Sequence, residues 1–193
     1  MTNNEPLDPI ANRMTVMLNR LGQGDASAAE ELMPLVYDEL KRLASGHMAN
    51  QTASHTFQPT VLAHEAWMRI VQSCGGTFEC RKQFFGLASR VMRTVLVDHA
   101  RAALSDMRGG GRQRVTLDED VRGNQTAGID LLELDEALVR LTELDPELAR
   151  LVELRFFGGL SLPEVAEALE LSLRSTERSW AFARSWLHRE LMQ

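Results

Sequence analysis

The side chains best suited to chemistry lie near the end of the chain, where polar residues recur at helical spacing. Arg174 and Arg178 are four residues apart, so on a helix they share one face. A guanidinium carries a planar fork of donors that can bind a guanine edge or a phosphate. Ser175 and Glu177 lie beside them and could bond to other bases. These four residues predict a helix that enters the major groove of DNA, although a helical hairpin with a solvated polar face has the same local pattern.

A short helix, a tight turn and a long helix must position these residues. Ser161 and Glu164 have the spacing of a capping box, which opens the short helix. Ala166 is small enough to let a second helix cross closely, and residues 170–172 predict the turn. Ser172 is the expected N-cap of the long helix, whose inward stripe consists of Leu173, Thr176, Trp180, Ala183, Leu187 and Leu191. This order of elements is typical of a helix-turn-helix.

Two consecutive segments of the chain carry opposite net charge. The net charge is −6, but residues 81–114 hold eight basic and two acidic side chains, whereas residues 117–153 hold eleven acidic and three basic ones. The mean charge therefore does not exclude nucleic acid as a partner of the basic block. The opposed blocks could also hold the free protein in a compact state in which its domains mask each other. The sequence leaves compact and extended states open, and high salt would loosen the compact one.

Helical periodicity extends along nearly the whole chain, and no segment gives a convincing strand pattern. We therefore expect an all-α protein with further helices at residues 10–21, 25–43, 59–71, 81–104, 131–141 and 145–158, and with a loop at residues 46–57. Pro34 should kink the second of these helices. The helix at residues 81–104 should turn its apolar side inward, which leaves a basic outer face made of Arg90, Arg93, Thr94 and Arg101.

Residues 108–128 contain several glycines and almost no apolar periodicity, so they predict a flexible linker. The expected organisation is two small helical domains, at residues 8–107 and 129–193, with the helix-turn-helix in the second. Because no apolar run approaches the about 20 residues that span a bilayer, we expect no membrane helix. The N-terminus is polar and acidic and shows no secretory signal, which favours a cytoplasmic protein.

The sequence shows no motif typical of an enzyme active site. No glycine-rich phosphate loop and no Ser/His/Asp arrangement stands out, so we expect neither a catalyst nor a cofactor. Two cysteines agree with a reducing compartment. Together with two of the five histidines they match no zinc spacing, so no metal site is predicted from Cys74, Cys80, His55 and His64. Cys74 and Cys80 flank a Gly-Gly-Thr sequence and could form a disulfide switch.

Several blocks of the chain together resemble one family. Residues 160–169 (Leu-Ser-Leu-Pro-Glu-Val-Ala-Glu-Ala-Leu) and 180–187 (Trp-Ala-Phe-Ala-Arg-Ser-Trp-Leu) are similar to the promoter-reading domain of extracytoplasmic-function (ECF) sigma factors, and to an ECF-like subgroup in particular. The same subgroup is matched by Leu35–Leu40, by Pro59–Thr60 with His64–Trp67, and by Phe84–Ala88 with Leu96–Arg101. The resemblance covers nearly the whole chain in the right order.

The resemblance implies a transcription initiation factor with core RNA polymerase and promoter DNA as partners. The first domain would bind the polymerase clamp and melt the minus-ten element, and the second would read the minus-thirty-five element as duplex. The implied polymerase-binding residues are His64, Glu65 and Arg69, with Trp67 packed inward. The implied contacts to unpaired DNA are Arg90, Arg93, Thr94, Asp98 and Arg101, with Phe85 or its neighbour Phe84 as a stacking platform. An anti-sigma factor or another regulator could bind as well.

This chain departs from the family pattern at three positions. Thr94 stands where the family has Asn, which weakens the case for that contact. Glu170 and Glu177 stand where members often have Gly and Lys, so the recognition helix is less basic than usual. Either it reads an unusual promoter or it depends heavily on the polymerase for affinity, and we favour the second. Two other interpretations stay open: a free-standing helix-turn-helix regulator, and a helical thiol or metal sensor that acts through protein contacts.

Overall fold

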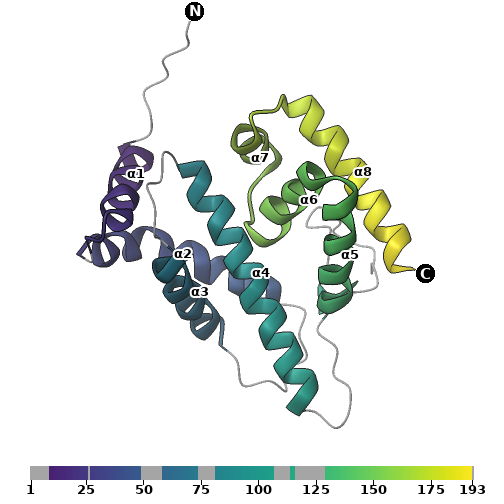
Figure 1. The fold of residues 1–193 in the computed structure, drawn as a ribbon, viewed down its shortest axis with the longest axis horizontal. Helices are drawn as coiled ribbons and strands as arrows, with labels where there is room; N and C mark the ends of the chain where they lie inside the picture. The colour runs from purple at the N-terminus through teal and green to yellow at the C-terminus, as the bar shows by residue number, and fades with distance from the viewer. Residues whose placement is uncertain are drawn as a thin grey trace, which may run out of the picture.

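The computed structural model describes residues 9–25, 27–48, 58–73, 81–106, 114–115 and 129–192, and within them the protein is all-α (Figure 1). Its helices are α1 (Pro9–Gly22), α2 (Ser27–Met48), α3 (Pro59–Ser73), α4 (Arg81–Asp106), α5 (Leu131–Leu144), α6 (Pro146–Val152), the π-helical turn η1 (Glu153–Phe157), α7 (Leu162–Leu169) and α8 (Leu173–Leu191). The fold class predicted from periodicity is confirmed.

Two strands of two residues each were not expected from the sequence. β1 (Arg114–Val115) pairs antiparallel with β2 (Ile129–Asp130), so that Arg114 lies opposite Asp130. Strands of two residues show no period-2 pattern, because an alternation of apolar and polar side chains is visible only over four or more residues. β1 lies within the predicted linker at residues 108–128, most of which is outside the described residues. The division into two domains stays a prediction.

The N-terminal half follows the predicted pattern with one difference. α2 includes Pro34 and ends at Met48, so residues 46–48 of the predicted loop are helical, and the rest of that loop lies outside the described residues. α3 starts at Pro59, as predicted from the tolerance of proline in a first helical turn, and buries Trp67. These helices pack their apolar stripes on one another and on α4.

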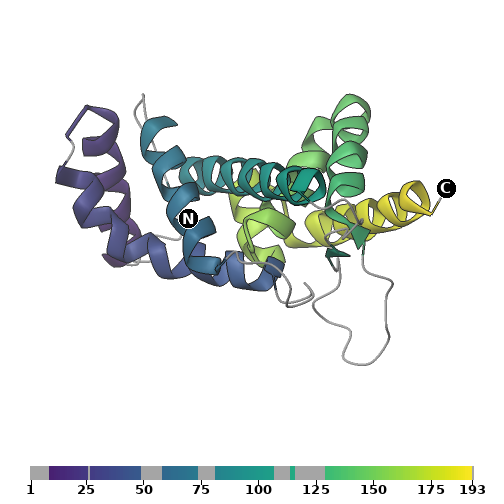
Figure 2. The same ribbon diagram turned by 90° about the horizontal axis from the view of Figure 1, so that it is seen from below.

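Helix α4 runs through the middle of the molecule, with α1 and α3 on one side and α5–α8 on the other, and α2 crosses α4 towards the C-terminal helices (Figure 1, Figure 2). Phe84, Met92 and Leu96 are buried, as its apolar spacing predicts for Phe84 and Leu96. The predicted basic outer face is wrong for Arg93, whose side chain is only 15% exposed. The sequence could not reveal this, because α5 and η1 cover that part of α4 and come from the other end of the chain.

The C-terminal half is built from helices with well-defined starts. Asp130 and Asp145 cap α5 and α6 by accepting from the backbone N–H groups of Leu132 and Leu148. A backbone bond from Gly158 N–H to Glu153 O, 3.0 Å long, closes the π turn. Inside α8 the predicted stripe is buried at Thr176, Trp180, Ala183 and Leu187, but Leu173 is 42% exposed and was wrongly assigned to it.

The two halves share one continuous cluster of buried hydrophobic residues. The Gly158–Gly159 turn after η1 docks on the N-terminal half, because a Cβ atom at Gly158 would collide with Ser89 of α4 and one at Gly159 with Leu43 of α2. Gly159 also has a φ of +62°, a conformation that side chains other than glycine and asparagine rarely adopt. Glycine at this turn therefore permits the close approach of the halves.

Candidate nucleic-acid interface

The short helix, tight turn and long helix predicted for a helix-turn-helix correspond to α7, residues 170–172 and α8. Ser161 accepts from the Glu164 N–H, and the Glu164 carboxylate accepts from the Ser161 N–H at 2.8 Å, so the predicted capping box is confirmed. Glu170 ends α7 with φ 58° and ψ 35°, and the Leu171 N–H then bonds to Ala166 O at 2.9 Å. Ala166 is buried, as its role at the helix crossing requires.

The start of α8 is held by hydrogen bonds of Ser172 and Thr176, and its opposite face is exposed to solvent. Ser172 Oγ accepts from the Ser175 N–H at 3.2 Å, and the buried Thr176 hydroxyl donates to Ser172 O at 3.1 Å. Arg174 and Arg178 are exposed on the first two turns of α8, and neither guanidinium pairs with a carboxylate of the described residues. Glu177 is exposed between them, and Ser175 is half-buried. Their contact with DNA stays a prediction.

The most heavily bonded of the residues predicted to contact unpaired DNA is Arg93. Its Nε and Nη2 both lie 2.8 Å from Asp135 Oδ1, its Nη2 donates to Asp135 O at 3.1 Å, and its Nη1 lies 2.5 Å from Glu153 Oε1. The Asp135 and Glu153 side chains are 15% and 18% exposed. All three nitrogens of this guanidinium therefore bind acceptors from α5 and η1.

The other predicted residues on α4 are more accessible. Arg90 and Thr94 are exposed, and their side chains bond back to the carbonyls of Gly86 and Arg90 on the same helix. Arg101 is 63% exposed and reaches Asp135 Oδ2 at 3.3 Å. The structure thus places all five predicted DNA contacts, Asp98 included, along one helix, and it holds one of them, Arg93, in ion pairs with α5 and η1.

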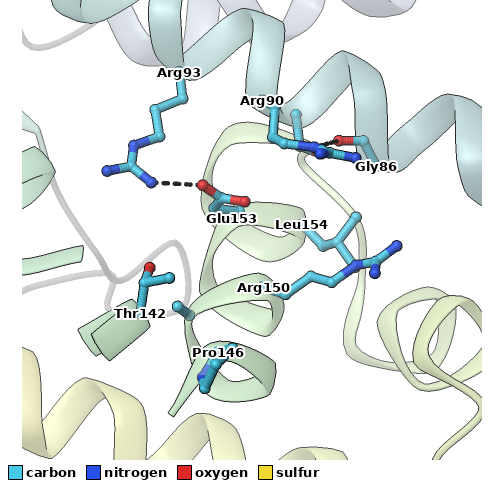
Figure 3. Close-up of a pocket in the computed structure, with 10 residues that line it drawn as sticks. Gly86, Arg90, Arg93, Thr142, Pro146, Arg150, Glu153 and Leu154 are labelled. Carbon is cyan, nitrogen blue, oxygen red and sulfur yellow. Dashed lines mark hydrogen bonds and ion pairs between the residues drawn. The ribbon is translucent and has the colours of Figure 1, made fainter. Parts of the chain in front are cut away.

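A cavity of about 310 Å³ lies between α4 and the C-terminal half (Figure 3). Arg90, Arg93 and Arg150 line it together with Glu153, and Arg93 points towards Glu153, whereas Arg90 lies along its own helix (Figure 3). No motif in the sequence singles out Asp135, Glu153 or Arg150. The opposed charge blocks were the available signal, but the residue pairing was not visible because Arg93 lies 42 and 60 positions from its two carboxylates.

The aromatic pair at the start of α4 is largely part of the core. Phe84 is buried, and Phe85 is partly buried and packs against the same core. Their rings meet edge to face with centroids 5.8 Å apart. Of the two rings, only that of Phe84 is therefore fully buried. Stacking of a DNA base on Phe85 stays a prediction.

The residues predicted to bind polymerase form a network with α4. Glu65 Oε1 binds Arg69 at 2.7 Å, Glu65 Oε2 lies 2.6 Å from His99 Nε2, and Arg69 Nη1 binds Asp98 Oδ2 at 2.9 Å. The hydrogen bond that Arg69 donates to Asp98 is the main cause that raises the pKa of Arg69, with Glu65 adding to it against the cost of burial. His64 is exposed on the same helix. The structure therefore joins Asp98, a predicted DNA contact, to the predicted polymerase surface.

The described residues hold no cluster of three or more histidine, cysteine, aspartate or glutamate side chains suited to a metal ion. Cys74, Cys80 and His55, which entered the metal and disulfide hypotheses, lie outside the described residues. No helix in the described part of the chain is both long and apolar enough to cross a membrane.

Comparison with known proteins identifies the family. A family model described as ECF sigma factor matches residues 11–193, which includes both halves and the helix-turn-helix. A comparison with individual curated proteins gives no match. Because the family match extends over nearly the whole chain, the protein belongs to the ECF sigma factors, a family of DNA-binding regulators that act in transcription initiation.

Proposed function

We propose that this protein binds core RNA polymerase, directs it to a specific set of promoters and helps to open the duplex there. The observation that carries the proposal is the helix-turn-helix at α7 and α8. The hydrogen bonds of its caps are made by serine side chains within the protein and do not use Arg174 or Arg178. Both arginines are exposed near the start of α8 and are available to a ligand. The family match supports the role in initiation.

Helix α8 would read the minus-thirty-five element as duplex DNA. Arg174 and Arg178 would enter the major groove from one helix face, and a bidentate arginine–guanine contact contributes about 1–3 kcal/mol of discrimination. Ser175 and Glu177 would complete the readout, with Glu177 accepting from a cytosine amino group. The negative charge of Glu177 weakens attraction to phosphates, which supports dependence on the polymerase for affinity.

Helices α3 and α4 would bind the polymerase and the separated minus-ten strand. His64, Glu65 and Arg69 would bind the polymerase clamp. Arg90, Arg93, Thr94, Asp98 and Arg101, with Phe85, would hold the separated minus-ten strand, since unpaired DNA is bound by cations along its backbone and by stacking of its bases. The chain would thus contact one promoter at two places, each served by a different half.

The test is transcription from genomic fragments by core polymerase with and without this protein, followed by sequencing of transcript 5′ ends. We expect a small set of start sites that appear only when the protein is present. The Arg174→Ala/Arg178→Ala variant should lose at least about tenfold of this activity, because each arginine contributes about 1–3 kcal/mol. Its binding to polymerase should be unchanged.

The matched control is Arg189→Ala, which removes a guanidinium from the exposed last turn of the same helix. It should keep the start sites of the unmodified protein. Tight specific DNA binding in the absence of polymerase, with no new transcripts in its presence, would contradict the proposal and favour a free-standing regulator.

A further inference from the structure

The cavity between α4 and the C-terminal half has an excess of positive charge. Three arginines line it, Arg90 and Arg93 from α4 and Arg150 from α6. Among the described residues that line the cavity, Glu153 is the one carboxylate, and Arg93 already binds it. The guanidinium groups of Arg90 and Arg150 are therefore left in the cavity wall with no carboxylate of the lining to balance them.

These two guanidinium groups approach the same turn of α4. Arg90 Nε donates to Gly86 O at 3.1 Å. Nη2 of Arg150 lies 3.5 Å from the position that a Cβ atom would take at Gly86. Both side chains extend to the Gly86 side of the cavity, whereas Arg93 points the other way, towards Glu153 (Figure 3). The fold thus brings one arginine from each half to one place.

Most donors of this arginine pair are unused within the described part of the chain. Arg90 uses its Nε for the bond to its own helix, and the Arg150 guanidinium makes no hydrogen bond or ion pair with the described residues. Both side chains are exposed, so a ligand can reach them from solvent. Two neighbouring cations in a concave surface raise the local positive potential and attract anions.

The donors and the size of the cavity favour a small phosphorylated compound. A guanidinium binds phosphate oxygens through its planar fork. The hydroxyl groups of Ser89 and Thr142 donate to carbonyls of their own helices, so the arginines are the donors for an anion. The volume of about 310 Å³ lies at the lower end of the about 300–1,000 Å³ that is typical of ligand sites. Pro146 and Leu154 add an apolar part to the wall.

We propose that this cavity binds a small phosphorylated compound, with its phosphate between Arg90 and Arg150 and its organic part against Pro146 and Leu154. Arg93 takes no part, because its guanidinium is bound to carboxylates. The DNA backbone carries phosphates of the same chemistry, but they belong to a long strand, whereas the cavity has the volume of a site for one small molecule. The free compound is therefore the favoured ligand.

The test is isothermal titration calorimetry of the full chain with two probes, phenyl phosphate and inorganic phosphate. We expect one site per chain and tighter binding of phenyl phosphate, because its ring can contact the apolar wall. Arg150→Gln should weaken the binding of both probes at least about tenfold, the factor expected for the loss of a hydrogen bond between charged groups. The absence of binding to the unmodified protein would overturn the proposal, and equal affinity for the two probes would overturn the place of the organic part.

The matched control is Arg189→Gln, which removes the same charge from an exposed position of α8 outside the cavity. It should keep the affinity of the unmodified protein. A further variant, Thr142→Phe, puts a ring at the cavity and keeps all the arginines, so it should weaken both probes as well. If Arg189→Gln weakened binding as much as Arg150→Gln, the probes would be responding to net charge, and the proposed site would be wrong.

A titration with a fluorescein-labelled single-stranded oligonucleotide, followed by fluorescence anisotropy, distinguishes the two sources of phosphate. Arg150→Gln and Thr142→Phe should bind the oligonucleotide as Arg189→Gln does, because the proposed ligand of the cavity is a small molecule. If the two cavity variants instead lost oligonucleotide affinity as strongly as they lost phenyl phosphate affinity, the cavity would bind the DNA backbone and the free compound would be the wrong ligand. None of these measurements uses polymerase, so their failure leaves the proposed function in transcription initiation standing.

Discussion

Nε and Nη2 of Arg93 both lie 2.8 Å from Oδ1 of Asp135, and this contact joins α4 to α5 across 42 positions of sequence. The Arg101 guanidinium reaches the other oxygen of the same carboxylate, at 3.3 Å. Two arginines therefore share one aspartate in very different surroundings, because Arg93 is 15% exposed and Arg101 is 63% exposed. Their contributions to stability should differ accordingly.

Replacement of Arg93 by methionine should lower the free energy of unfolding by about 2–3 kcal/mol, because Asp135 and Glu153 would be left largely buried without their main counter-charge. Arg101→Met should lower it by less than about 1 kcal/mol, because solvent screens this longer and exposed pair. Urea unfolding of both variants checks the difference. Equal losses in the two variants would contradict the ranking of the two contacts.

Glu170→Gly should stabilise the protein by about 1 kcal/mol, because residue 170 has a positive φ that costs an ordinary side chain roughly that much. The control is Glu167→Gly inside α7, where glycine should instead destabilise by about 0.5–1 kcal/mol. Thermal unfolding of the two variants should therefore move in opposite directions. A loss of stability in Glu170→Gly would mean that contacts of the Glu170 side chain outweigh the backbone cost.

Ser161→Ala should lower the free energy of unfolding by about 1 kcal/mol, because it removes the side chain that caps the first turn of α7. Ser185→Ala provides the comparison, since Ser185 is exposed inside α8 and alanine favours a helix interior. That second change should be neutral or slightly stabilising in the same urea titration. If the two serines proved equivalent, the capping box would contribute nothing to α7.

Asp98→Asn should weaken binding to core polymerase by about 1.4- to 5-fold, the range that corresponds to an exposed ion pair of about 0.2–1 kcal/mol. Asp98 holds Arg69, which we place on the polymerase surface, at 2.9 Å. Thr94→Ala lies one turn earlier on α4, and its hydroxyl bonds only to the helix backbone among the described residues, so polymerase binding should not change. Surface plasmon resonance with immobilised core polymerase measures both. Loss in the Thr94 variant alone would contradict the assignment of the two surfaces.

Local features of the fold were predictable because they depend on neighbours in sequence. The caps at Ser161 and Ser172, the proline start of α3 and the buried face with Trp67 each follow from residues within a few positions of one another. The same reasoning failed for Leu173, because its place beside the N-cap leaves it outside the stripe that the rest of α8 buries.

Contacts across the chain were not predictable in the same way. The outer face of α4 was assigned from its own periodicity, which cannot show that Asp135 and Glu153 return to cover Arg93. Opposed charge blocks indicated an attraction between the two regions and left the compact state open. Only the folded arrangement shows which arginine the carboxylates bind and which ones remain exposed.

The central claim is that two surfaces of this protein contact one promoter at two places within the polymerase complex. Photo-crosslinking tests it directly, with a photoreactive phenylalanine analogue at Phe182, which is 58% exposed one turn after Arg178, or at the exposed Thr94. In the complex with polymerase, position 182 should crosslink to upstream duplex and position 94 to the separated strand downstream of it. Crosslinks from both positions to the same DNA segment, or crosslinks that do not require polymerase, would contradict the account.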